Sequence, residues 1–296
     1  MNGDNSLAVA SGTNNRATVR GNNSAAYAGS NGTGNTGNTA TVNGDNSLAS
    51  AGSFGDNNIN NRASATGNGT YAFAGGGLPF IDRLPTGPVT DSRPGSGNDY
   101  NTATAVAAPG TGGGPVGAGN SSVIAGSAGI NNDGNRAIGA SSGSAQASAA
   151  AGVYGENNSG NTATAIGTGD NSFAFAAAGV DGRNNVGNAA TATSTGDGSP
   201  GFPPTSQAFA QSGNFGDSNT NNRATAINRG DNSFTHARAG SNGNNNTNNR
   251  ATAITLDDFL RTLAYAGSDA DNNNRYTATA FNGGTDIQPP PEAAAP

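Results

Sequence analysis

The sequence has no cysteine, no tryptophan and no lysine, and it contains a single histidine, His236. Without cysteine, disulfide bonds and thiolate zinc sites are excluded. Because lysine is absent, all 13 basic residues are arginines. This choice of basic residue, together with abundant alanine and glycine, favours a high-GC, actinobacterial source.

Large apolar residues are also scarce, since only 32% of the 296 residues are hydrophobic while 48 are glycine. A conventional core of leucine, isoleucine and phenylalanine is therefore excluded. The net charge of −6 is too small for self-repulsion to hold the chain open. No apolar run approaches the roughly 20 residues of a membrane span, and the first residues lack the basic and apolar regions of a signal peptide. Because a repeat starts directly after Met1, we expect an export signal upstream and a secreted or cell-surface location.

Two short phrases alternate along the chain, and their repetition is the main structural signal. The first is Asn-x-Ala-Thr-Ala or a close relative of it. Its copies begin at Asn15, Asn38, Asn61, Asn101, Asn135, Asn161, Asn188, Asn222, Asn249 and Asn274. The basal repeat is about 23 to 27 residues long, and Gly/Pro-rich inserts near 75–99, 108–120 and 196–206 lengthen it.

The second phrase ends in Ala-x-Ala-Gly, as in "NSLASAG" at 46–52, and both phrases alternate with the period of a β-strand. The residue between the alanines varies from Ser50 to Phe73 to Arg238, so we expect it to face outward and the alanines inward. The phrases predict an all-β parallel β-solenoid over residues 1–282, with two short strands per coil and about ten coils. Its thin alanine core would be reinforced by asparagine ladders.

Two segments depart from this repeat. Residues 254–264, "ITLDDFLRTLA", predict a short helix capped by Thr255, which would close the solenoid near its end. Residues 283–296 are expected to form a Pro-rich extended tail.

Three outward sets of residues are candidates for interaction. An aromatic stripe would be covered by the inserts or would mediate self-association or the binding of a partner. A threonine ladder resembles the Thr-x-Thr faces of ice-binding solenoids. In the first six copies of a third ladder arginine alternates with threonine, which separates like charges by two rungs, whereas the last three copies all carry arginine. The aromatic stripe comprises Tyr27, Phe73, Phe175, Phe209 and Tyr265, the threonine ladder Thr18, Thr41, Thr104, Thr164, Thr191, Thr225 and Thr252, and the arginine ladder runs from Arg16 and Arg62 to Arg250 and Arg275.

Catalytic chemistry is nearly absent from the sequence, so we expect a protein that is not an enzyme and needs no cofactor. His236 has no companion in its repeat, no phosphate-binding loop is present, and dispersed arginines do not predict a nucleic-acid surface. The "GDNSLA" turns are similar to calcium-binding nonapeptides, but Asp recurs only at Asp4, Asp45, Asp170 and Asp231. We interpret these segments as uncharged Asn/Gly turns, whose residues tolerate a left-handed backbone. Calcium binding in these turns is the alternative. Arg229-Gly230-Asp231 is interpreted as one such turn.

The phrases "GDNSLAVASG", "GDNSFAFAAAG" and "NTATAIGTGDNS" resemble the repeats in the heads of YadA-type trimeric autotransporter adhesins, which implies a parallel β-roll. They also resemble the Asn/Gly/Ala-rich secreted repeat proteins of mycobacteria and relatives, which implies an exported protein. From these features we expect a non-catalytic extracellular structural or adhesive protein that self-associates, or assembles into a fibre, or binds a host or cell-surface partner. An ice-binding or other ligand-binding solenoid is the alternative.

Overall fold

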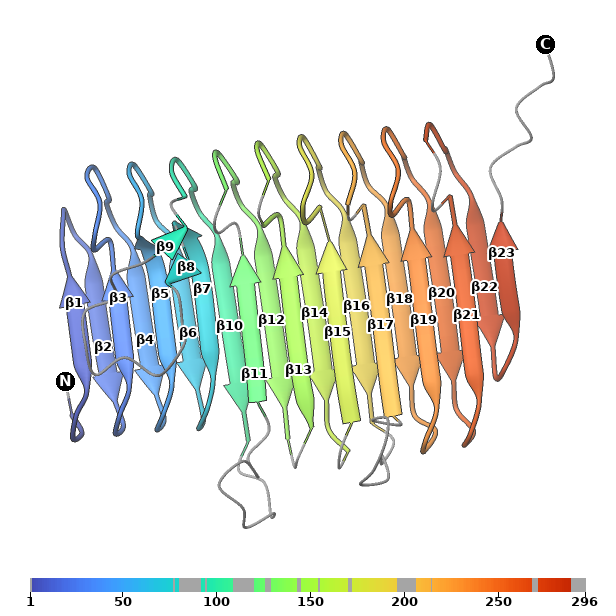
Figure 1. The fold of residues 1–296 in the computed structure, drawn as a ribbon, viewed down its shortest axis with the longest axis horizontal. Helices are drawn as coiled ribbons and strands as arrows, with labels where there is room; N and C mark the ends of the chain where they lie inside the picture. The colour runs from blue at the N-terminus through green and yellow to red at the C-terminus, as the bar shows by residue number, and fades with distance from the viewer. Residues whose placement is uncertain are drawn as a thin grey trace.

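The computed structural model is a rod of two long, parallel β-sheets (Figure 1). It describes residues 2–76, 78–79, 92–93, 95–108, 120–125, 129–142, 145–153, 155–169, 172–195, 206–213, 215–267 and 271–288. Within these ranges there is no helix. Each coil places one strand in each sheet, so the predicted parallel β-solenoid with two strands per coil is confirmed.

The first sheet has 11 strands in the order β1-β3-β5-β7-β11-β13-β15-β17-β19-β21-β23. Their bounds are β1 Leu7–Ala10, β3 Ala25–Ala28, β5 Leu48–Ser53, β7 Tyr71–Gly76, β11 Asn120–Ala125, β13 Gln146–Ala151, β15 Ser172–Ala178, β17 Ser206–Ser212, β19 Phe234–Ala239, β21 Arg261–Ala266 and β23 Thr285–Gln288.

The second sheet has 10 strands in the order β2-β4-β6-β10-β12-β14-β16-β18-β20-β22. Their bounds are β2 Arg16–Arg20, β4 Thr39–Asn43, β6 Arg62–Thr66, β10 Thr102–Ala107, β12 Arg136–Ser141, β14 Thr162–Gly167, β16 Ala189–Ser194, β18 Arg223–Asn228, β20 Arg250–Thr255 and β22 Thr277–Phe281. A separate antiparallel pair joins β8 Leu78–Pro79 to β9 Ser92–Arg93.

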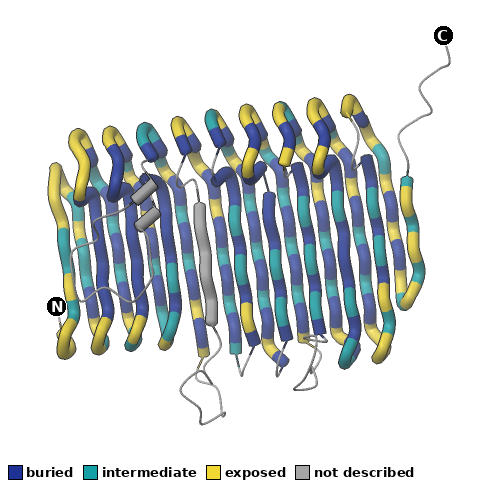
Figure 2. Tube along the Cα trace, viewed as in Figure 1, coloured by how far each residue is buried: buried dark blue, intermediate teal, exposed yellow. Residues whose placement is uncertain are grey.

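The core between the sheets is a stack of alanines, as the alternation predicts. In the ten-stranded sheet, Ala40, Ala63 and Ala103 follow one another in register and are fully buried. Residues between the inward alanines point outward, and Figure 2 shows the resulting alternation of buried and half-buried positions along strands such as β14 and β16. Alanine buries little apolar area, at about 25 cal/mol per Å², so the stack depends heavily on hydrogen bonds between coils.

Two asparagine ladders run along one edge of the rod. In the first, the backbone N–H and the side-chain Nδ2 of Asn61 both donate to Oδ1 of Asn38, at 3.0 and 3.1 Å. The second ladder lies three residues earlier, where the N–H of Asn58 donates to Oδ1 of Asn35 at 2.9 Å. From Asn35 onwards the ladder asparagines are almost fully buried, so each coil satisfies most of the polar groups of its neighbours.

The fixed glycine of Ala-x-Ala-Gly follows from these ladders. Gly52 has a φ of 56°, and a Cβ at this position would lie 2.3 Å from Oδ1 of Asn38. Both the left-handed backbone and the close approach of the ladder therefore require glycine.

The predicted helix at 254–264 is wrong, because these residues form β20, a turn over 256–260 and β21. The Thr255 hydroxyl donates to Oγ1 of Thr262 at 2.7 Å inside the core and does not cap a helix. Phe259 has a φ of 56°, and its N–H donates to the carbonyl of Asp231 in the preceding coil at 3.0 Å. Hydrogen bonds to a neighbouring coil outweigh the weak preference of a short segment for helix.

The predicted tail begins with a strand, since β23 pairs with β21 in parallel. Asp286 and Gln288 occupy the inward positions opposite Ala264 and Ala266, and Asp286 Oδ2 accepts the N–H of Thr279 at 2.7 Å. Polar side chains thus replace the alanine pair in this strand. Residues 289–296 and most of the three inserts lie outside the described residues, as does the expectation that inserts cover the aromatic stripe.

Candidate functional site

The outward residues of the ten-stranded sheet form three parallel columns, which we call the Arg/Thr face. The first column begins Arg16, Thr39, Arg62, Thr102, Arg136 in strict register. Neighbouring strands are about 4.8 Å apart, so these three arginines recur about every 9.6 Å along the rod. The alternation predicted for the first coils is confirmed by this register.

The prediction that Arg275 is the last member of the arginine ladder is wrong. Thr277, and not Arg275, is the register partner of Arg250. Arg275 lies in the preceding turn with a φ of 63°, and Asn274 forms an isolated bridge with Thr247. The extra residues of "NRYTATA" shift the phrase by two positions, so only Arg223 and Arg250 are adjacent arginines in this column.

The second column is the threonine ladder. Threonine occupies this column in every coil except two, where Ser64 and Ile138 replace it. Its threonines are Thr18, Thr41, Thr104, Thr164, Thr191, Thr225, Thr252 and Thr279. All seven threonines predicted from the sequence lie in one column, and Thr279 extends it.

None of the three columns of the Arg/Thr face contains an aspartate or glutamate. The third column holds Arg20, Asn43, Thr66, Val106, Ala140, Ile166, Thr193, Ile227, Ile254 and Phe281. The chain as a whole has 19 acidic and 13 basic residues. Among the described residues the acidic side chains lie in turns and loops, apart from Asp286 in β23, so this face is cationic on an acidic protein.

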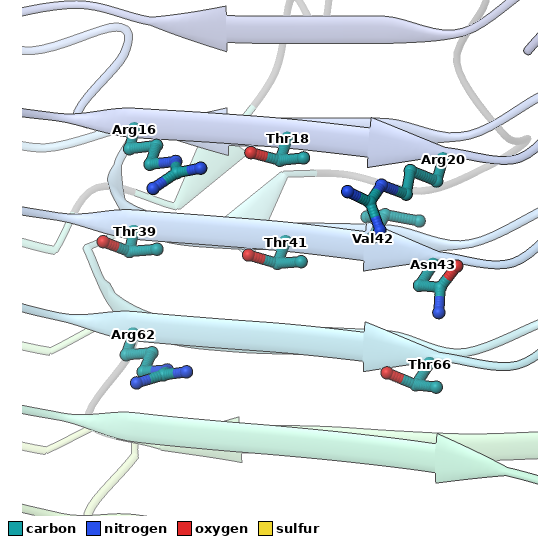
Figure 3. Close-up of a pocket in the computed structure, with 9 residues that line it drawn as sticks. All are labelled: Arg16, Thr18, Arg20, Thr39, Thr41, Val42, Asn43, Arg62 and Thr66. Carbon is teal, nitrogen blue, oxygen red and sulfur yellow. The ribbon is translucent and has the colours of Figure 1, made fainter. Parts of the chain in front are cut away.

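At the N-terminal end of this face, a shallow groove of about 520 Å³ crosses β2, β4 and β6 (Figure 3). Three arginines surround it, and the remaining lining residues are four threonines, Val42 and Asn43. In Figure 3 the Arg20 side chain reaches towards β4 above Val42 and beside Asn43. Its lining arginines and threonines are Arg16, Arg20, Arg62, Thr18, Thr39, Thr41 and Thr66.

The arginines of the groove have exposed side chains, and none of them forms an ion pair with another described residue. Within the described part of the chain, the one ion pair joins Arg183 to Glu156, whose Nε and Oε2 atoms are 3.6 Å apart. The guanidinium groups of Arg16, Arg20 and Arg62 therefore keep donors for an external acceptor. Arginine matches carboxylate, sulfate and phosphate oxygens through paired N–H groups.

The predicted aromatic stripe is not a single column. Tyr27 and Phe73 lie in one column with Ser50 between them, and Tyr265 lies further along it. Phe175 and Phe209 lie in the neighbouring column with His236. The glycine after the alanines sets the register, and in the coils of Phe175 and Phe209 this glycine comes two residues later.

The outer face of the eleven-stranded sheet carries an aromatic cluster that includes His236. The cluster is formed by Phe173, Phe175, Phe209, Phe234, His236 and Tyr265. The His236 ring lies 5.7 Å from that of Phe209 and 5.4 Å from that of Tyr265, and Arg238 Nε donates to its Nε2 at 3.3 Å. The expectation that His236 has no companion is therefore wrong. Register brings together side chains from neighbouring coils that lie about 27 residues apart in sequence.

At the other end of the same sheet, Tyr27 and Phe73 are buried, and Tyr27 packs edge-on against Phe54. Burial raises the pKa of the Tyr27 hydroxyl above its ordinary value, and burial does the same for Tyr71. Phe175, Phe209 and Tyr265 are half-buried.

The Asp/Asn turns serve the stacking of the coils. Asp45 Oδ1 accepts the N–H of Asn22 at 2.6 Å, and Asp258 Oδ1 accepts the N–H of Asp231 at 2.7 Å. A Cβ at Gly230 would lie 2.0 Å from the carbonyl oxygen of Asp257, so Arg229-Gly230-Asp231 is part of a packed turn. The described residues hold no group of three or more His, Cys, Asp or Glu side chains placed for a metal, and Asp170 lies outside them. Calcium in these turns stays a prediction.

Comparison of the chain with protein-family models, with curated proteins and with solved structures gives no significant match. Among the described residues no helix is long and apolar enough to cross a membrane. The class of the molecule is therefore defined by its own geometry, as an alanine-cored parallel β-solenoid with a cationic, threonine-rich face.

Proposed function

We propose that this protein is a non-catalytic, extracellular structural or adhesive surface protein, and that the Arg/Thr face is its adhesive surface. The observation that carries the proposal is the absence of acidic residues from all three columns of that face, on a chain with net charge −6. A flat face that keeps only one sign of charge is suited to an anionic surface.

Adhesion by this face would be the sum of many weak contacts. An exposed arginine contributes only about 0.2–1 kcal/mol to an ion pair. Several arginines on one rigid rod bind together, because the first contact raises the effective concentration of the others. The Debye length is about 8 Å at physiological salt. The repulsion between two arginines that lie two coils apart is therefore largely screened.

Adsorption to charged beads tests this proposal. The wild-type protein should be retained on sulfonated beads at about 0.05 M salt, released at about 0.5 M salt, and pass neutral beads at both. The variant R62Q/R136Q/R250Q should lose most of this retention. The matched variant R183Q/R229Q/R275Q has the same net charge but leaves the Arg/Thr face intact, and it should be retained like the wild type. Equal loss in both variants would rule out adhesion through this face.

Self-association remains part of the proposal, with the aromatic cluster as the surface involved. Asp286 and Gln288 at the inward positions of β23 argue against continuing the stack at this end, because the added coil would cover polar groups with alanine. Electron microscopy at high protein concentration tests the idea. Laterally paired rods or fibres would support it, whereas single short rods throughout would refute it.

A second candidate function is ice binding, and the threonine column, which is interrupted only at Ser64 and Ile138, favours it. Hydroxyls and methyl groups would recur about every 4.8 Å on a flat face. The wild-type protein would then show thermal hysteresis, and T164K would reduce it because the lysine stands above the plane of the column. An absence of hysteresis in the wild-type protein would exclude this function.

A further inference from the structure

We propose that the groove bounded by Arg16, Arg20 and Arg62 binds a linear acidic polysaccharide, which runs along the rod with successive acidic groups on Arg16, Arg62 and Arg136. This inference rests on the proposed adhesive function and names the class of ligand. Four features of the described residues carry it, namely the charge of the groove, the spacing of its arginines, its hydroxyl groups and its lack of aromatic rings.

The groove supplies cationic donors with no internal competitor. Arg16, Arg20 and Arg62 are exposed, and none has an ion pair among the described residues. No aspartate or glutamate lines the groove. An entering anion therefore replaces water at the guanidinium groups and displaces no protein carboxylate.

The spacing of the arginines selects for a polymer with regularly repeated charges. Arg16 and Arg62 are two rungs apart in the same column, as are Arg62 and Arg136, which gives about 9.6 Å for each step. Arg20 lies four residues further along β2, about 13 Å from Arg16 across the face. A chain running along the rod meets one arginine in every second coil, with Arg20 beside it.

Hydroxyl groups fill the positions between the arginines. Thr39 lies between Arg16 and Arg62 in the first column, and Thr18 and Thr41 lie beside them in the second. Threonine hydroxyls both donate and accept hydrogen bonds, and the amide of Asn43 does the same. Sugar hydroxyls, which also donate and accept, are matched by this lining.

Nucleic acid is the less suitable polyanion. Proteins that hold single strands stack the bases on aromatic side chains, and no column of the Arg/Thr face carries an aromatic residue in the coils of β2, β4, β6, β10 or β12. Among the described residues, the aromatic rings that contact one another from coil to coil lie instead on the opposite sheet.

Hyaluronan oligosaccharides test the proposal, because each disaccharide carries one carboxylate. Binding would be followed by NMR through the Nε–H signals of the arginines. R62Q should weaken binding of the tetrasaccharide about fivefold, as expected for one exposed charge-assisted contact. R136Q should leave the tetrasaccharide unaffected and weaken an octasaccharide, which is long enough to reach the third arginine. R250Q, in the same column at the far end, should leave both unchanged.

The controls separate this inference from the proposed adhesion. Equal losses for R62Q and R250Q, or no gain in affinity with oligosaccharide length, would overturn the aligned polysaccharide. Tighter binding of oligothymidylate or poly-glutamate than of a hyaluronan of equal charge would assign the groove to another polyanion and also overturn it. If these results came with retention on sulfonated beads, the adhesive function would stand without the polysaccharide. Loss of that retention as well would remove both.

Discussion

The two outer faces of this rod rest on one alanine core and yet differ in chemistry. The ten-stranded sheet presents arginine and threonine with no acidic residue, whereas the eleven-stranded sheet presents rings that contact one another across coils. In the coil formed by β17 and β18, Phe209 stands on one face and Thr225 on the other. The difference teaches that the interior and the edge ladders define the coil, which leaves the outward positions to vary independently.

The largest effect on the free energy of unfolding should come from breaking the asparagine ladder, which supports both faces. Asn135 donates from its N–H and Nδ2 to Oδ1 of Asn101 at 3.0 and 3.1 Å, and its own Oδ1 accepts from Asn161. N135A would leave several buried groups unpaired and should cost about 3 kcal/mol of unfolding free energy. Urea unfolding followed by circular dichroism measures this loss.

The control for this prediction is N131G, since Asn131 is exposed in the same turn with a φ of 54°. Glycine tolerates that backbone, so N131G should change the unfolding free energy by less than about 0.5 kcal/mol. Comparable losses in both variants would mean that the ladder is not the shared support of the two faces.

A smaller effect should separate the two faces within a single coil. F209A removes a half-buried ring that contacts Phe173, Phe175, Phe234 and His236, and it should lower the unfolding free energy by about 2 kcal/mol. T225A, on the opposite side of the same coil, should lower it by about 0.5 kcal/mol or less. The denaturant concentrations at the unfolding midpoints of the two variants are compared, with the slope of unfolding free energy against denaturant concentration held constant. Equal costs would contradict a stabilising role confined to the aromatic face.

The smallest effect concerns Tyr27, whose buried hydroxyl has no hydrogen-bond partner among the described residues. Y27F removes that unpaired group and should raise the unfolding free energy by about 1 kcal/mol. Thermal unfolding at neutral pH measures the gain. A loss of stability would show that the hydroxyl is satisfied in solution.

The stability of the protein at alkaline pH provides a second test of the role of Tyr27. Burial raises the folded-state pKa of Tyr27 above that of the unfolded chain, so the stability it contributes is present below the ordinary tyrosine pKa. That stability is lost as the pH rises through the folded-state value. Y27F should therefore flatten the decline of stability above about pH 10, and an unchanged decline would place its cause elsewhere.

The solenoid, its two strands per coil, its alanine core and the threonine column could be predicted because each depends on a local period of two and on the repeat of the phrase. Aligning the aromatic stripe required knowing that Gly179 and Gly213 set the register of their coils, which the alanine pattern alone conceals. The turn at 256–260 depends on hydrogen bonds to Asp231 and Ser233 in another coil. The groove depends on the Arg20 side chain reaching to the next strand. Neither can be read from a single repeat.

Because the asparagine ladder repeats the same hydrogen bonds at each junction, the length of the rod is a whole number of coils. Every junction between coils uses nearly the same bonds, so duplicating one repeat would extend the rod by about 4.8 Å without a new interface. Surface groups on either side of the insertion would move apart by that amount while keeping their column. The distance between two arginines is thus a property that gene duplication adjusts in fixed increments, and the rod acts as a molecular ruler for whatever lies along it.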